Sequence, residues 1–207
     1  MLWQCGDDAV AALVLAHGAG AGMQHASMQA IATAFELRGI ATLRFDFPFM
    51  AEGRNRVDRP AVATAAIAAA YAAAAQRTKL PIWLGGHSFG GRMASHAIVE
   101  RALPAAGLIC CSFPLHMPGK PDSKRAQHLA AIRQPMLFLS GTRDELAKRE
   151  LLEPLVASLP TAMLHWLDTA DHGYRVLKRQ RTRTDSVFDE MAEAARAFID
   201  RHSSGSA

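Results

Sequence analysis

Six short apolar runs recur along this 207-residue chain, and they constrain its fold more than any other feature. Most of the runs are continuous and do not alternate with polar residues, which is typical of strands buried on both faces of a parallel sheet. The strands predicted from these runs are Ala11–Ala16, Ala41–Phe45, Ile82–Leu84, Gly107–Cys111, Met136–Leu139 and Met163–Leu167.

Segments of helical character separate the runs. Gln24–Arg38 ends before Gly39, which suits a helix C-terminus, and Pro60–Arg77 opens on a proline, which suits a helix N-terminus. Further helices are predicted at Ser88–Ala102, Lys124–Arg133, Glu145–Leu159 and Asp185–Arg201. Strand and helix therefore alternate six times, which indicates an α/β fold with a doubly wound, mainly parallel six-stranded sheet.

No linker divides the chain, so we expect one domain over residues 1–201 and a disordered tail over residues 202–207. Half of the residues are apolar, which suits a soluble globular protein with a sizeable core. No window approaches the roughly 20 continuous apolar residues of a membrane span, and no basic segment precedes an apolar run as in a secretory signal. Three cysteines do not make a disulfide framework, so a cytoplasmic location is expected.

The net charge of +4 is mild but unevenly distributed. Basic side chains crowd two stretches, residues 54–59 and the segment from Arg175 to Arg183. They are either solvated charges of loops and helix ends or an anion-attracting rim. Aromatic residues are not interleaved with the basic ones, so nucleic acid is not an expected partner.

The sequence Gly86-His87-Ser88-Phe89-Gly90 stands between a predicted strand and a predicted helix. A serine with a glycine two residues away on each side suits a sharp strand-to-helix turn, where the serine is strained and needs small neighbours. The pattern is short enough to occur by chance, so its weight comes from its surroundings. It predicts that Ser88 is a nucleophile.

A serine hydroxyl needs a base to take its proton and an acid to orient that base. In a parallel sheet such groups gather at the carboxyl ends of the strands. Asp144 and His172 each lie just beyond a predicted strand, as Ser88 does, and the order Ser…Asp…His is the one expected of this architecture. Ser88, Asp144 and His172 are therefore the predicted catalytic residues.

Negative charge that develops on a carbonyl oxygen needs preset N–H donors. The N–H of Phe89, at the start of its helix, is expected to be one donor. The loop from His17 to Gly22 follows the first predicted strand, and its small residues let the backbone approach a ligand. We expect the N–H of Ala19 to be the second donor; the alternative is a flexible loop without a role.

The remaining residues that we expect at the substrate are His17, Gly18, Gly20, His87, Met50 and Met117. The two methionines could equally belong to the core. No pair of histidines or cysteines has the spacing of metal ligands, so no metal and no other cofactor is expected. Asp46 is interpreted as a loop-ordering partner for Arg54 or Arg56.

The sequence resembles the α/β-hydrolase superfamily over nearly its whole length. More closely, it is similar to an α/β-hydrolase-like family shared by small bacterial proteins, a testis-expressed protein and a subunit of the nonspecific-lethal chromatin complex. Dienelactone hydrolases are a more distant relation. The matching stretches are Leu13–Gly20, Leu43–Pro48, Gly85–Met93, Pro118–Pro121, Gly141–Asp144 and Asp171-His172.

The resemblance implies an α/β-hydrolase fold in which Ser88, His172 and Asp144 are nucleophile, base and acid of a serine hydrolase that acts on small esters. Only a proline-rich loop fits where a lid domain would stand. His87 and Phe89 depart from the lysine and methionine frequent beside the serine in such relatives. Two alternatives stay open: an interaction protein with weak or no turnover, and perhydrolase chemistry at the same residues.

Overall fold

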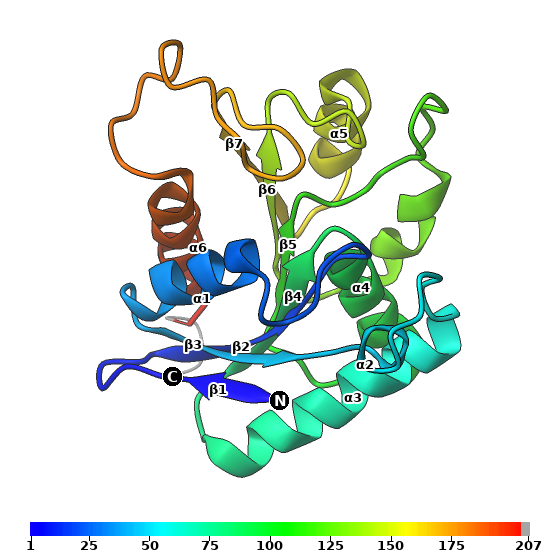
Figure 1. Ribbon diagram of the computed structural model, residues 1–207, viewed down its shortest axis with the longest axis vertical. Helices are drawn as coiled ribbons and strands as arrows, with labels where there is room; N and C mark the ends of the chain where they lie inside the picture. The colour runs from blue at the N-terminus through cyan, green and yellow to red at the C-terminus, as the bar shows by residue number, and fades with distance from the viewer. Residues whose placement is uncertain (204–207) are drawn as a thin grey trace.

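The computed structural model describes residues 1–203, and a seven-stranded sheet runs through their centre (Figure 1). Its strand order is β1-β3-β2-β4-β5-β6-β7. The strands are β1 (Leu2–Gln4), β2 (Ala11–Ala16), β3 (Ile40–Phe45), β4 (Ile82–His87), β5 (Leu108–Cys111), β6 (Met136–Gly141) and β7 (Ala162–Leu167). Strands β2 to β7 are parallel, and β1 alone pairs antiparallel, with β3. The predicted mainly parallel α/β sheet is confirmed.

The central strands are apolar throughout because both faces of the sheet are covered. All six residues of β2 are buried, and its side chains alternate between two cores. Val14 and Ala16 point into one core, and Leu13 and Leu15 into the other. The period of two along a strand thus divides one continuous apolar run between two layers of helices.

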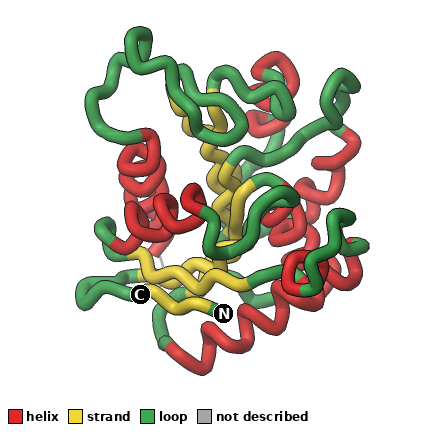
Figure 2. The backbone as a smooth tube through the Cα atoms, viewed as in Figure 1, coloured by secondary structure: helices red, strands yellow, loops and turns green. Residues whose placement is uncertain are grey.

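Helices cover both faces of the sheet (Figures 1 and 2). Helices α1 and α6 pack on one face, and α3, α4, α5 and the 3₁₀ helix η1 pack on the other. Their bounds, with those of the short helix α2, are α1 (Ala26–Glu36), α2 (Pro48–Ala51), α3 (Pro60–Arg77), α4 (Phe89–Arg101), η1 (Lys124–Ala131), α5 (Arg149–Ala157) and α6 (Val187–Ser203). This is the single-domain arrangement expected of a doubly wound sheet.

Two elements were not predicted from the sequence, and others differ in detail. Strand β1 is only three residues long and partly exposed, so it leaves no apolar run to detect. Helix α2 is a single turn, and η1 is a 3₁₀ helix where an α-helix was expected. Helix α6 extends past the predicted domain boundary at residue 201, and the rest of the predicted tail, residues 204–207, lies outside the described residues.

In the described part of the chain, the loops at the carboxyl ends of the parallel strands carry no further domain. Residues 112–123, between β5 and η1, form a loop in the place where a lid would stand. A long segment without regular structure, residues 168–186, joins β7 to α6 (Figure 2). Within residues 1–203, no helix combines the length and the apolar character that crossing a membrane requires.

Replacing Leu13 tests the contribution of the two-sided core. Leu13 is fully buried in β2, whereas Leu37 is 73% exposed at the end of α1. We expect Leu13→Ala to lower the free energy of unfolding by about 2–5 kcal/mol, and Leu37→Ala by less than about 0.5 kcal/mol. Urea unfolding of both variants measures the difference; equal losses would contradict the packing described for β2.

Candidate active site

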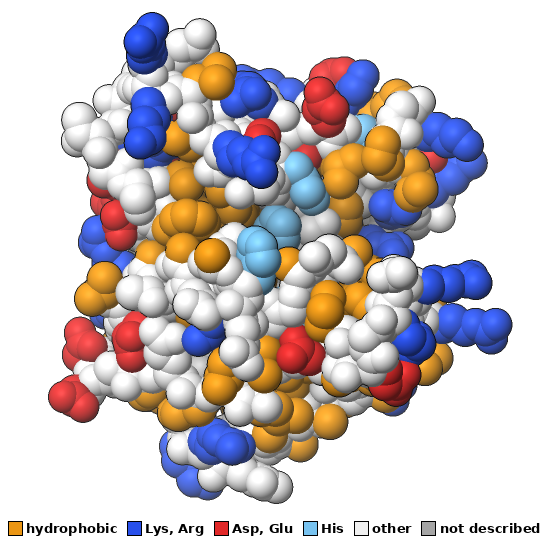
Figure 3. Space-filling model, viewed as in Figure 1, with side chains coloured by type: hydrophobic (Ala, Val, Ile, Leu, Met, Phe, Trp, Pro, Cys, Tyr) orange, Lys and Arg blue, Asp and Glu red, His pale blue; other side chains and the backbone are white. Residues whose placement is uncertain are grey.

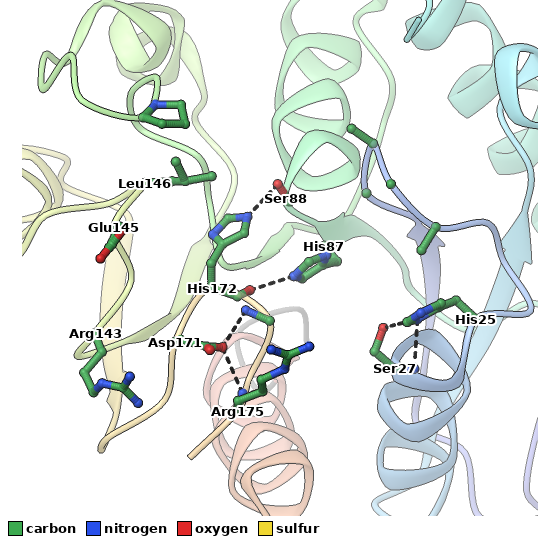
Figure 4. A pocket seen from close by; sticks show the side chains of 16 residues that line it. His25, Ser27, His87, Ser88, Arg143, Glu145, Leu146, Asp171, His172 and Arg175 are labelled. Atoms are coloured by element: carbon green, nitrogen blue, oxygen red, sulfur yellow. Dashed lines mark hydrogen bonds between the residues drawn. The ribbon is translucent and has the colours of Figure 1, made fainter. Parts of the chain in front are cut away.

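Three side chains from three separate strand ends meet at the carboxyl edge of the sheet, and Figure 4 shows two of them, Ser88 and His172. Ser88 follows β4, Asp144 follows β6, and His172 follows β7. His172 Nε2 lies 2.8 Å from Ser88 Oγ, so it can accept the hydroxyl proton. On the other side of the ring, His172 Nδ1 lies 2.9 Å from each carboxylate oxygen of Asp144. The structure thus brings the three predicted residues into one hydrogen-bonded chain.

Ser88 sits on a sharp turn that requires glycine at positions 86 and 90. Its φ of 52° and ψ of −116° are strained for a residue with a side chain. A Cβ at Gly86 would lie 2.2 Å from the carbonyl oxygen of Ala16, and one at Gly90 would lie 2.3 Å from the same oxygen. The turn therefore presses against the end of β2 with no space for a side chain, and Ser88 Oγ is presented above it.

His172 is held by a compact turn of the loop after β7. Asp171 Oδ1 accepts the N–H groups of Gly173 and Arg175, and the N–H of Asp171 donates to the carbonyl of Arg175. The carboxylate of Asp171 therefore serves the turn, while the buried carboxylate of Asp144 faces the ring of His172. Asp144 Oδ1 also accepts the N–H of Leu146 at 2.8 Å, which fixes its orientation.

His87, predicted to contact the substrate, also supports His172. Its Nε2–H donates to the carbonyl oxygen of His172 at 2.9 Å, and the two rings lie 5.4 Å apart. Burial lowers the pKa of His87 to about 4, so its ring is neutral near pH 7 and keeps the N–H that this bond needs. The residue before the nucleophile thereby ties β4 to the loop that carries the histidine.

His17 and Asp46 hold the loop after β2 in place through hydrogen bonds. His17 is fully buried; its Nδ1–H donates to the carbonyl of Gly18, and its Nε2 accepts the N–H of Phe47. Asp46 Oδ1 accepts the N–H of Met23 at 2.7 Å. His17 is thus a support of the loop and does not line the cavity.

The predicted pairing of Asp46 with Arg54 or Arg56 is wrong. Arg54 pairs with Asp58 and Glu52 instead. The reason is local: Arg54 and Asp58 stand four residues apart in one loop, whereas Asp46 faces the loop after β2.

Phe89 contributes two groups to the site, its aromatic ring and the first backbone N–H of α4. The first N–H groups of a helix have no partner within it, so the Phe89 N–H is available at the turn. Its ring packs edge-on against Phe47 and Phe49, at centroid distances of 5.3 and 6.1 Å. The ring of His17 joins the same cluster, 5.0 Å from Phe47. This cluster anchors the turn and the Gly18 loop to one buried support.

A cavity of about 900 Å³ opens above Ser88 and His172 (Figure 4). Four other predicted residues, Gly18, Ala19, Gly20 and His87, line it. Met50 and Met117 do not: Met50 packs against the core, and Met117 is half exposed on the loop before η1. The complete lining is Gly18, Ala19, Gly20, Ala21, His25, Ser27, His87, Ser88, Pro118, Arg143, Glu145, Leu146, Asp171, His172, Gly173 and Arg175.

Several polar residues of this lining were not predicted from the sequence. Arg143 and Glu145 flank Asp144, and Asp171 precedes His172. Their closeness in sequence to predicted site residues was the signal that could have found them. His25 caps α1 through Nδ1 and lines the cavity as well.

The basic segment from Arg175 to Arg183 combines different structural roles. Arg181 pairs with the buried Glu190 of α6, and Arg183 pairs with Asp185 and Glu193. Arg175 instead lines the cavity. On the face of the molecule drawn in Figure 3, histidine side chains lie near the centre, with Lys and Arg side chains around them. Within residues 1–203, no group of three or more His, Cys, Asp or Glu is arranged to hold a metal ion.

Substitution of Gly90 tests the close packing of the turn. We expect Gly90→Ala to lower the free energy of unfolding by about 1–3 kcal/mol, because the new methyl group would meet backbone oxygens of Ala16 and His17. Gly20→Ala is the matched control, since a Cβ there meets nothing within 4 Å. Denaturant unfolding compares the two variants, and equal stabilities would rule out the steric account.

Protonation of His87 links the stability of the protein to pH. The pKa of His87 is 6.5 when unperturbed and about 4 in the folded protein, because burial disfavours the charged ring. Between these values the unfolded chain binds a proton that the folded protein does not, so stability is full above about pH 6.5 and falls progressively towards pH 4. The slope of this loss should be smaller in His87→Gln when urea unfolding is measured at stepped pH.

Part of the slope remains in that variant, because burial lowers the pKa of His128 to about 4 as well. An identical slope in the variant and the parent protein would contradict the low pKa of His87.

Three solved structures share this fold at low sequence identity. Est1E from Butyrivibrio proteoclasticus, with ferulic acid bound, is 17% identical with a TM-score of 0.73, and the match covers 98% of this chain and 94% of that one. A dienelactone hydrolase from Anabaena variabilis is 18% identical with a TM-score of 0.71, covering 96% and 89%. An α/β serine hydrolase without a lid from Xanthomonas campestris is 20% identical with a TM-score of 0.69, covering 95% and 85%.

At these identities the three structures show the fold alone. The dienelactone hydrolase among them agrees with the distant likeness predicted from the sequence. A family described as the alpha/beta hydrolase domain matches residues 9–200, almost the whole chain. The chain therefore belongs to the alpha/beta hydrolase family.

Proposed function

We propose that this protein is a serine hydrolase of the esterase type, which cleaves small ester or acyl substrates through an acyl-enzyme intermediate. The hydrogen-bonded chain from Ser88 Oγ through His172 to Asp144 carries the proposal, because it joins a nucleophile, a base and an acid at the floor of a cavity. Membership of the alpha/beta hydrolase family supports hydrolytic chemistry in general.

The proposed reaction follows from these contacts. His172 Nε2 takes the proton of Ser88 Oγ while Oγ attacks the carbonyl carbon of the substrate, and Asp144 stabilises the imidazolium that forms. The N–H groups of Phe89 and Ala19 are the proposed donors to the oxyanion. His172 then gives the proton to the leaving alcohol. It next deprotonates a water molecule, which attacks the acyl-enzyme; the acid is released, and the proton returns to Ser88.

The other assignments belong to the same proposal. Gly18, Gly20 and His87 contact the substrate from the cavity wall, and His17 holds the loop that presents Ala19. No cofactor takes part in the proposed steps. A cytoplasmic location and the narrower resemblance to the testis-expressed protein and the chromatin-complex subunit remain predictions from the sequence.

Removing the nucleophile or reorienting the base tests the proposal. We expect Ser88→Ala to lower kcat for an aryl ester by about four to six orders of magnitude. Asp144→Asn should lower it by about 10⁴-fold, because the amide no longer holds His172 in the required tautomer. Initial rates on the ester, followed by release of the phenol, measure both effects.

Labelling by a fluorophosphonate probe gives an independent readout at the nucleophile. The parent protein and Ser158→Ala, which changes an exposed serine at the end of α5, should be labelled, and Ser88→Ala should not. A parent protein that neither turns over esters nor reacts with the probe would favour the alternative of an interaction protein.

A further inference from the structure

Most of the side chains that line the cavity above Ser88 end in polar or charged groups. Its apolar side chains are those of Ala19, Ala21, Pro118 and Leu146, and the remaining lining residues are glycines or carry polar or charged groups. Small-molecule sites usually offer mainly hydrophobic and aromatic walls with a few polar groups. The polar and charged groups of this wall therefore favour a small substrate that carries such groups itself.

Arg175 brings a positively charged side chain to this cavity, and its backbone is held in place by hydrogen bonds. Its backbone N–H donates to Asp171 Oδ1 at 2.9 Å, and its carbonyl accepts the N–H of Asp171 at 3.0 Å. The Cα of Arg175 is thus fixed to the turn that carries His172. Figure 4 shows the guanidinium extending back from this turn towards His87.

The guanidinium of Arg175 has no hydrogen bond or ion pair to the protein within residues 1–203, whereas two other arginines of the same segment form ion pairs. Arg181 is paired with Glu190, and Arg183 is paired with two carboxylates. An arginine presents a planar fork of N–H donors that matches a carboxylate or a phosphate. Arg175 therefore has its donors free at the cavity.

Neither acidic residue of the lining, Asp171 or Glu145, forms an ion pair with the Arg175 guanidinium. Asp171 Oδ1 accepts two backbone N–H groups of the turn. Figure 4 shows Glu145 with Arg143 on the opposite side of His172 from Arg175. Arg143 is itself held by the carbonyl of Thr169 at 3.1 Å. His25 lines the same cavity, and Figure 4 shows it, like Arg175, on the side of His172 away from Glu145. This side therefore suits an anion better than the side of Glu145.

We propose that Arg175 binds an anionic group of the substrate, so that the preferred substrates are small esters whose acyl or alcohol part carries a carboxylate or a phosphate. This inference rests on the proposed hydrolase function. Arg175 takes no part in bond making or breaking; it determines specificity by pairing with the remote anionic group while the ester carbonyl lies at Ser88.

Matched pairs of esters test the proposal on both parts of the substrate. For the acyl part, mono-4-nitrophenyl succinate is compared with 4-nitrophenyl butyrate, which has the same number of acyl carbons and no charge. For the alcohol part, 4-acetoxybenzoate is compared with its methyl ester. We expect kcat/KM of the parent protein to be higher for the anionic member of at least one pair.

The ratio of kcat/KM for the anionic and the neutral ester is then measured in variants. Arg175→Ala should lower this ratio by about 10- to 100-fold, chiefly through KM, as for loss of a charge-assisted hydrogen bond. Arg175→Lys should recover part of it, because it keeps the charge but not the fork. Arg179→Ala removes the same charge from the same segment outside the cavity, and should change the ratio by less than about twofold.

The outcomes separate the two proposals. A parent protein that hydrolyses the neutral esters but gives the same ratio as Arg175→Ala overturns the anion site and leaves the hydrolase function standing. An equal loss in Arg179→Ala also overturns it, because the effect is then long-range attraction. If the folded parent protein, checked by circular dichroism, hydrolyses no ester in either pair, the hydrolase function and the anion site both fall.

Discussion

Contact of backbone with backbone at the turn around Ser88 is the constraint on which the rest of the site depends. Side chains are excluded at Gly86 and Gly90 because their Cβ positions fall within 2.2 and 2.3 Å of the carbonyl oxygen of Ala16. Strand β4 and helix α4 can therefore approach the end of β2 more closely than packed side chains would allow. The approach sets the nucleophile beside the loop that begins at Gly18, so one contact positions both the hydroxyl and the N–H groups proposed to face it.

The histidine of the site is positioned by different means, because it stands on a loop. Residues 168–186 have no regular structure, and hydrogen bonds replace the rigidity that a helix or strand would provide. The Asp171 carboxylate closes the turn, the ring of His87 holds the carbonyl of His172, and the pair of Arg181 with Glu190 ties the far end of the loop to α6. The basic segment from Arg175 to Arg183 thus contains two arginines in structural ion pairs, Arg181 and Arg183, and one arginine that lines the cavity, Arg175.

The residues that the sequence identified share a property that topology guarantees. Ser88, Asp144 and His172 each follow a predicted parallel strand, and the carboxyl ends of parallel strands meet at one edge of a sheet, so their convergence could be predicted without coordinates. The positions of Met50 and Met117 could not be predicted from topology in this way. Apolar residues on loops can face a cavity or the core, and the choice depends on packing across segments far apart in the sequence.

The order of strands and helices, the two-sided core and the strand-to-helix turn were determined by local patterns: continuous apolar runs, proline and glycine at helix ends, and glycines on both sides of a serine. Strand β1 lacked such a pattern, because three half-exposed residues acquire their structure only by pairing with β3. Tertiary structure alone decided that Asp46 holds the N–H of Met23 and that the Arg175 guanidinium stays unpaired among the described residues. A charged side chain can reach several partners, and only the folded chain settles which of them lies within hydrogen-bond distance.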